Sequence, residues 1–212
     1  MLVDHFPVLG LRVRTPRLEL RLPGPDELAA LADLAAEGIH PPDRMPFLVP
    51  WTAQEPKLVG RSLVQFFWRR MGAWEPDDWG LDLVAFADGE PVGEQTINGR
   101  AFAVTREVHT GSWVGRRHQG RGIGTEMRRA VLHLAFAVLG AEVAISGAFS
   151  DNDASRSVSR KLGYEPDGTV RHSVRGELAV EQRFRLTRAA WRDDLPVAVE
   201  GFEPCRELFG LR

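Results

Sequence analysis

Cysteine, lysine and long apolar runs are scarce in this sequence, and each scarcity excludes a class of protein. The 212 residues include one cysteine, Cys205, which excludes an internal disulfide and a multi-cysteine metal site. The longest apolar stretch, residues 130–139, is broken by His133 and is too short to span a bilayer. The N-terminus carries an early acid, Asp4, and lacks the apolar core of a secretory signal. We therefore expect a cytoplasmic protein without membrane contact.

A large net charge is also missing. There are 27 basic and 29 acidic residues, for a formal net charge of −2, whereas nucleic-acid-binding domains are usually strongly basic. Lys57 and Lys161 are the only lysines, so nearly every basic residue is an arginine, which can bind phosphate bidentately where it clusters. Hydrophobic residues make up 43% of the chain, enough for a sizeable core. We expect a globular protein with no nucleic-acid partner.

The spacing of apolar residues predicts strands interleaved with helices. Predicted strands cover residues 11–22 (interrupted by Pro16), 81–87, 92–97, 106–114, 143–145, 169–174 and 181–186. Predicted helices cover residues 25–38, 58–71, 125–139 and 152–162. Such interleaving favours one α/β or α+β domain, over residues 1–192. Residues 193–212 are predicted to form an extension that packs on this body or on a partner subunit.

A glycine-rich turn between the strand at 106–114 and the helix at 125–139 carries the most chemical information. Glycines 120, 122 and 124 allow backbone amides to approach a ligand closely. The following helix adds unpaired amides and the positive end of its dipole, which together form an anion site. The arginines at or near the turn are Arg116, Arg117, Arg121 and Arg128. The turn points to phosphate or pyrophosphate, and a purely structural strand-to-helix turn is the alternative.

Two common phosphate-binding motifs do not fit this turn. A Walker loop needs Gly-Lys-Ser/Thr, which does not follow these glycines. A dinucleotide-binding fingerprint needs Gly-x-Gly-x-x-Gly early in a βαβ unit, but these glycines have a different spacing and lie past the midpoint of the chain. NAD binding is therefore disfavoured.

Two motifs in this sequence resemble those of the GCN5-related N-acetyltransferase (GNAT) superfamily. The run Gln119-x-x-Gly122-x-Gly124 resembles its coenzyme A loop, and Asn152-x-x-Ser155 followed by Gly163-Tyr164 resembles its second signature. The resemblance spans roughly residues 11–192. It implies an α/β (α+β) fold with a mixed, mostly antiparallel central sheet flanked by helices. It also implies an acyl-CoA site at a splayed strand pair and direct acyl transfer to an amine.

Shorter segments resemble particular branches of this superfamily. Arg14–Leu18 and Trp113–Gly115 resemble ribosomal-protein alanine N-acetyltransferases, while Asp43–Phe47 and Gly111–Trp113 resemble an actinobacterial group that includes a mycobacterial succinyltransferase. The resemblance implies acetyl-CoA or succinyl-CoA as co-substrate, no metal, and a homodimer. The acceptor would be a protein N-terminus, a lysine or a small amine. A non-catalytic CoA-binding regulator is the alternative.

The resemblance also implies a role for each motif residue. The backbone of Trp113, Val114 and Gly115 would pair with the pantetheine arm. The pyrophosphate would be held by amides of the turn: Gln119, Gly120, Arg121, Gly122, Ile123, Gly124 and Thr125. Asn152 would bond the pantetheine, Ser155 would protonate the departing thiolate, and Arg156 would reach the nucleotide phosphates. Helix capping is the alternative for Asn152 and Ser155.

The general base is the least determined part of this site. An ammonium nucleophile must lose a proton before it attacks a thioester, so a carboxylate or imidazole is needed nearby. His109 is the first candidate, although this branch often has an acidic residue at about that place. The other candidates are Glu94, His172, Glu177 and Glu181. The histidines do not have the spacing of a metal site.

Overall fold

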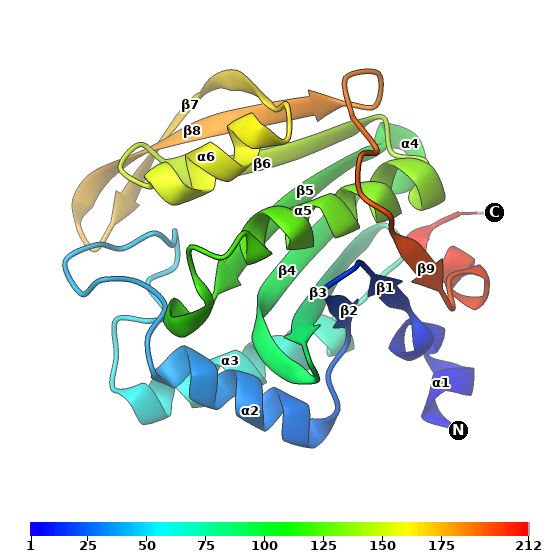
Figure 1. Cartoon of the computed structure of the whole chain (residues 1–212), viewed down its shortest axis with the longest axis horizontal. Coiled ribbons are helices and arrows are strands. Elements are labelled where there is room, and N and C mark those ends of the chain that lie inside the picture. Colours follow the sequence, from blue (N-terminus) through cyan, green and yellow to red (C-terminus); the bar gives the residue numbers. More distant parts are fainter. Residues whose placement is uncertain (212) are drawn as a thin grey trace.

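The computed structural model describes residues 1–211. Their strands form one nine-stranded sheet (Figure 1). Its strands are β1 (Arg12–Arg14), β2 (Glu19–Arg21), β3 (Asp78–Ala87), β4 (Glu90–Arg100), β5 (Glu107–Val114), β6 (Val143–Phe149), β7 (Glu165–Val174), β8 (Glu177–Thr187) and β9 (Ala198–Glu200). Their order in the sheet is β7-β8-β6-β5-β4-β3-β2-β1-β9. Only the β5–β6 pair is parallel among these neighbours. The predicted mixed, mostly antiparallel sheet flanked by helices is confirmed.

Helices cover both faces of this sheet (Figure 1). The α-helices are α1 (Leu2–His5), α2 (Pro25–Ala36), α3 (Pro56–Gly72), α4 (Phe102–Thr105), α5 (Ile123–His133) and α6 (Asp153–Lys161). The other helical turns are η1 (Pro7–Gly10), η2 (Arg116–His118), the π-helical η3 (Leu134–Leu139) and η4 (Glu203–Phe209). A buried cluster with Leu31, Phe67 and Trp113 lies under α2 and α3, and a larger one with Met127 and Phe136 lies under α5 and η3.

The parallel strands β5 and β6 separate before they end. They pair from Glu107 and Val143 as far as Thr110 and Ser146, whereas β5 continues to Val114 and β6 to Phe149. Residues 111–114 and 147–149 therefore border an opening, which we call the strand gap. Thr110 and Ser146 mark its closed end.

The C-terminal segment packs on the beginning of the chain. Strand β9 pairs with β1, and Phe209 is buried against Trp74 and Trp79 at ring distances of 5.4 and 4.8 Å. The indole of Trp74 also donates a hydrogen bond to the carbonyl of Leu208 (2.7 Å). Arg212, the last residue of the predicted extension, lies outside the described residues. The homodimer stays a prediction.

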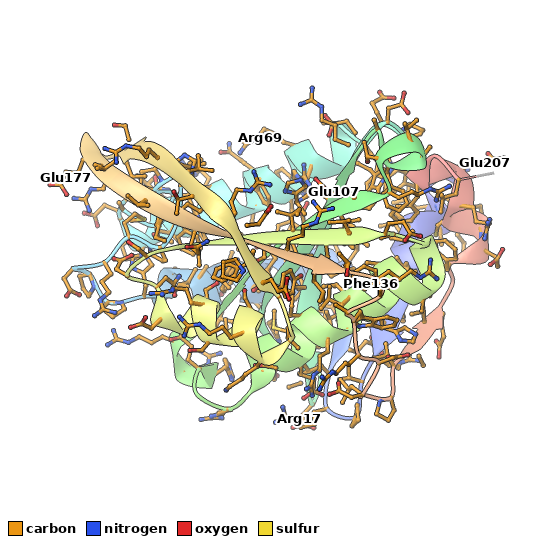
Figure 2. All side chains as sticks on the ribbon, turned by 90° about the horizontal axis from the view of Figure 1, so that it is seen from above. Arg17, Arg69, Glu107, Phe136, Glu177 and Glu207 are labelled. Atoms are coloured by element: carbon orange, nitrogen blue, oxygen red, sulfur yellow. The ribbon has the colours of Figure 1, made fainter. Side chains whose placement is uncertain are left out.

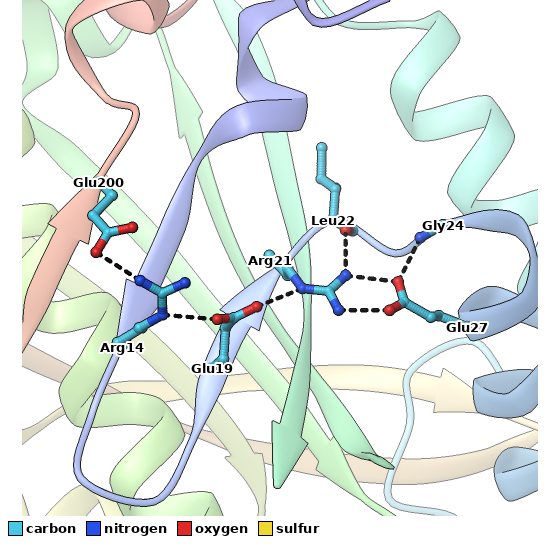
Figure 3. A network of polar contacts seen from close by, with 7 residues as sticks. All are labelled: Arg14, Glu19, Arg21, Leu22, Gly24, Glu27 and Glu200. Atoms are coloured by element: carbon cyan, nitrogen blue, oxygen red, sulfur yellow. Dashed lines mark hydrogen bonds and ion pairs between the residues drawn. The ribbon is translucent and has the colours of Figure 1, made fainter. Parts of the chain in front are cut away.

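A chain of ion pairs ties this edge of the sheet to the start of α2 (Figure 3). Arg14 bonds Glu200 of β9 and Glu19 of β2 at 2.6 and 2.8 Å. Glu19 also accepts a hydrogen bond from Arg21 (2.6 Å), whose guanidinium donates to both carboxylate oxygens of Glu27. The bond from Arg21 lowers the pKa of Glu27 to about 2, so this carboxylate remains charged through moderate acid.

Candidate active site

The strand gap exposes backbone groups of β5. The amides of Gly111 and Gly115 point toward β4, where they donate to a threonine hydroxyl (3.1 Å) and a carbonyl (3.0 Å). Peptide groups alternate sides along a strand, so the amides of Ser112 and Val114 face the gap. The backbone of Trp113, by the same alternation, faces β4. An extended ligand in the gap would thus meet a strand edge at Ser112 and Val114.

The glycine-rich turn follows directly from this strand end. Gly120 and Gly122 adopt φ of +75° and +79°, the left-handed region that favours glycine. In the described chain, the amides of residues 120–122 have no backbone acceptor, and those of Ile123 and Gly124 open α5, where a helix supplies none. The turn therefore presents a series of free amides at a helix N-terminus, which is an anion-binding arrangement.

Gln119 holds the turn in place through its side chain. Its Nε2 donates to the carbonyls of Val114 and Ile39, each at 2.7 Å. These two bonds join the turn both to the end of β5 and to the segment after α2. Gly115 lets α2 approach the end of β5 closely, because any Cβ at this position would lie only 2.5 Å from the side chain of Leu34.

Positive charge surrounds the turn. Burial, and then the charges of Arg117 and Arg121, lower the pKa of His118. Arg117 pairs with Glu37, whereas Arg116 and Arg121 form no ion pair with any described residue. Free amides and unpaired guanidinium groups together suit a pyrophosphate.

Helix α6 begins beside β6 with three predicted site residues at its start: Asn152 is the N-cap, and Ser155 and Arg156 follow in the helix. The side-chain carbonyl of Asn152 accepts a hydrogen bond from the Ser155 amide (3.2 Å), so Asn152 caps the helix. Its amide NH2 has no partner among the described residues. The guanidinium of Arg156 donates to the carbonyl of Ser150 (2.7 Å) and lies 3.4 Å from Asp153, so it is held at the helix start.

Arg128 lies buried at the closed end of the gap, on the face covered by α5. Its side chain donates to the hydroxyls of Ser146 (2.8 Å) and Ser112 (3.2 Å), while its buried Nε has no acceptor. Only 3% of Arg128 is exposed, and no carboxylate pairs with it in the described chain. The hydroxyl of Tyr164 lies 3.4 Å from that of Thr110, on the last paired residue of β5. Sequence reasoning counted Arg128 with the arginines at or near the glycine-rich turn and did not predict its burial; its place one helical turn before the apolar Leu132 was the available signal.

The opposite face of the sheet, under α2 and α3, carries an aromatic wall. The indole of Trp113 donates to buried Glu94 at 2.6 Å, and its ring lies 6.1 Å from that of Trp51 in the loop before α3. Burial, and then the negative charge of Asp82, raise the pKa of Glu94 to about 8. Glu94 therefore fixes the indole of Trp113 through this hydrogen bond, and its buried carboxyl group is not accessible to a substrate.

The other candidate bases occupy different positions. The His109 side chain is 58% exposed, lies 3.3 Å from Glu107, and comes before the gap on β5. Glu177 lies at the outer tip of the β7–β8 hairpin (Figure 2). His172 and Glu181 contact each other at 2.8 Å, next to β6. Of the five candidates, only this pair brings two potential bases together.

Residues 1–211 hold no group of three or more His, Cys, Asp or Glu side chains arranged to share a metal ion. Within the same residues, no helix has both the length and the apolarity needed to cross a membrane.

Comparisons with known proteins agree with this geometry. The family model of the acetyltransferase (GNAT) domain matches residues 17–165. Among solved structures, a ribosomal L7/L12 alpha-N-protein acetyltransferase, RimL, in complex with coenzyme A is similar, with a TM-score of 0.64, 16% identity, and coverage of 82% of this chain and 95% of that one. The microcin C7 self-immunity acetyltransferase MccE, in complex with acetyl-CoA and AMP, gives a TM-score of 0.62, 16% identity, and coverage of 81% and 93%. A chimera of the spermidine N-acetyltransferase SpeG from Vibrio cholerae and hSSAT gives a TM-score of 0.62, with 12% identity and coverage of 82% of this chain and 96% of that one. With a family model matched over most of its length, this chain belongs to the GNAT family of acetyltransferases.

Proposed function

We propose that this protein transfers an acetyl group from acetyl-CoA to an amine by direct attack in a ternary complex. The observation that carries the proposal is the strand gap, which ends at a turn of free amides at the start of α5. Pyrophosphate would bind the free amides of residues 120–124, with Arg121 beside it. The amides of Gln119 and Thr125, which the sequence also assigned to this role, instead donate to the carbonyls of Arg116 (3.3 Å) and Gly122 (3.1 Å). The pantetheine arm would then lie along β5, next to Asn152, with the thioester at the closed end of the gap.

Catalysis would consist mainly of positioning and of stabilising charge. The amine nitrogen attacks the thioester carbon, the C–S bond breaks, and the CoA thiolate leaves. An amide of β5 that faces the gap, such as that of Val114, would hydrogen-bond the carbonyl oxygen as it becomes negative. Ser155, in the first turn of α6, would return a proton to the thiolate. A thiol is already acidic enough that this proton transfer contributes little.

Succinyl-CoA is a second candidate donor, and Arg128 is the observation that favours it. A buried guanidinium with only hydroxyl partners is the group that a free acyl carboxylate would pair with. Arg44, in the exposed part of the loop after α2, is another cation on the acceptor side. Acetyl-CoA requires no such cation.

Ligand binding and turnover test this function separately. Thermal unfolding is followed with CoA, acetyl-CoA, succinyl-CoA, NAD and ATP, and release of CoA thiol is followed with peptide N-termini, lysine and small amines as acceptors. A ligand at a hundred times its dissociation constant stabilises the native state by about 2.7 kcal/mol. We expect stabilisation by the CoA compounds only. Arg121→Glu should weaken this stabilisation. Arg192→Glu should not, because the neighbours of Arg192 contact His133 and Phe136 at the opposite end of this helix from the turn. Binding without turnover would identify a CoA-binding regulator instead, and stabilisation by NAD alone would refute the proposal.

The donor is decided by comparing Arg128→Leu with the wild-type chain. If succinyl-CoA is the donor, its kcat/KM should exceed that of acetyl-CoA in the wild type, and Arg128→Leu should remove this preference. If acetyl-CoA is the donor, the wild type should prefer it, and the variant should change the two donors alike.

A further inference from the structure

Glu181 and His172 form a hydrogen-bonded pair on the β7–β8 hairpin. The ring Nε2 of His172 lies 2.8 Å from Oε2 of Glu181, and their side chains are 20% and 30% exposed. The ring of Phe149 packs edge-on against His172 at 6.2 Å. Arg183 of the same hairpin pairs with Asp167 at 3.0 Å and not with Glu181. The Glu181 carboxylate therefore has no arginine partner among the described residues. The carboxylate is thus fixed by one imidazole and still reaches solvent.

The Glu181 carboxylate lies directly over Gly147. A Cβ added to Gly147 would come within 1.8 Å of Oε1 of Glu181, so the carboxylate occupies the space that the missing side chain of Gly147 leaves. Gly147 is the first residue of β6 beyond the last pair with β5, and it therefore borders the strand gap. Oε2 faces His172, and Oε1 is left at the edge of the gap.

The carboxylate also lies on the side of the sheet from which an acceptor would enter. Ser146 points toward α5, where it meets Arg128, so the next residue faces the other side, toward α2 and α3. Trp113 occupies the same face on the opposite border of the gap. An amine approaching from this face would pass between the Trp113 ring and the Glu181 carboxylate.

We propose that Glu181 is the general base of the acyl transfer and that His172 is its positioning residue. This inference rests on the proposed function. An ammonium group of the acceptor gives one proton to Oε1 of Glu181, and the neutral nitrogen then forms the new C–N bond as the C–S bond breaks. After attack the nitrogen loses a second proton, the CoA thiolate takes up one proton through Ser155, and Glu181 gives its proton to solvent, so that each turnover releases one proton. His172, donating from Nε2 to Oε2, keeps the other oxygen directed at the gap.

Glu181→Gln tests the role of the carboxylate at almost constant shape. We expect kcat to fall by about a hundredfold or more, the usual contribution of a general base, with CoA affinity and thermal stability unchanged. Glu177→Gln, on the same strand at the hairpin tip, is the matched control, and His109→Gln tests the competing base. Both should keep wild-type kcat.

The choice of acceptor separates base catalysis from a structural role. An alkylamine is a cation at pH 7 and must lose a proton before attack, whereas an acid hydrazide is already neutral. Glu181→Gln should therefore lose far more activity with benzylamine than with a hydrazide, and formate should partly restore Glu181→Ala. His172→Gln, as a positioning change, should lower kcat about tenfold and shift the pH profile without altering KM for acetyl-CoA.

Each outcome decides a specific point. Wild-type turnover combined with an unchanged kcat in Glu181→Gln would overturn the assignment of Glu181 and leave the proposed function standing. An equal loss with benzylamine and hydrazide would also overturn it, because a structural defect affects both acceptors alike. If the wild-type chain binds CoA but turns over no amine, the proposed function and this inference both fail.

Discussion

Replacing Glu94 by glutamine should make the stability of the protein less dependent on pH. The pKa of this buried carboxyl is raised to about 8 from an ordinary value of 4.5, first by burial and then by the charge of Asp82. Between these two values the folded chain keeps a proton that the unfolded chain has released, so the free energy of unfolding decreases as pH rises. At about 1.4 kcal/mol for each pKa unit, the full penalty at alkaline pH is about 5 kcal/mol.

Glutamine cannot ionise, yet it retains an acceptor oxygen for the indole of Trp113. The stability of Glu94→Gln relative to wild type should therefore increase by about 3 kcal/mol between pH 5 and pH 8. Urea unfolding followed by circular dichroism at four pH values measures this difference. Glu90→Gln, at the exposed start of the same strand, is the control and should follow the wild-type curve. If the curves of Glu94→Gln and wild type run parallel, Glu94 is ionised in the fold and the reasoning is wrong.

Three further predictions address other parts of the molecule. Binding of CoA should raise the lowered pKa of His118, because a pyrophosphate offsets the charges of Arg117 and Arg121; an NMR titration with and without CoA would show no change if the phosphates bind elsewhere. Phe209→Ala should destabilise the protein by about 3 to 5 kcal/mol in urea unfolding, since its ring is completely buried, and a loss under 1 kcal/mol would mean that the tail contributes little. The pKa of Glu27 is lowered to about 2, so its contribution is present above about pH 4.5 and is lost as pH falls toward 2. Glu27→Gln should therefore lower stability at pH 7 but not at pH 2, by no more than about 1 kcal/mol because the pair is partly exposed, and equal losses at both pH values would refute this.

Local signals made much of the fold predictable. The glycine turn, the helix after it and the helix at 152–162 depend on spacing and capping within a few residues, and the structure has them as α5 and α6 with the turn between. Strand β6 is longer than the predicted 143–145, because Gly147 and Ala148 carry little of the alternation that marks a strand. Strand β9 was not predicted, since its three residues form a strand only by pairing with β1.

The parts of the site that sequence could not provide depend on contacts between distant segments. That Glu181 lies over Gly147 follows from the register of β8 against β6, and no local pattern determines that register. From the sequence, His109 was preferred to Glu181 as the base, because the sheet order that brings Glu181 to the gap was not known. Arg128 and Arg121 are both arginines near the same glycine-rich turn, and nothing local in the sequence distinguishes them. Only the packing of α5 places Arg128 in the core.

The pairing of β9 with β1 has a consequence for the chain during its synthesis. Strand β1 is among the first segments to leave the ribosome, and until residues 198–209 follow, it has β2 as its only neighbour in the sheet. Over the same interval Trp74 and Trp79 lack the cover of Phe209. An unpaired strand edge beside tryptophans that lack part of their cover is a surface that favours aggregation and chaperone binding. Nascent or stalled chains should therefore be held by chaperones through this surface, and completed chains should lose it as their last turn, η4, folds.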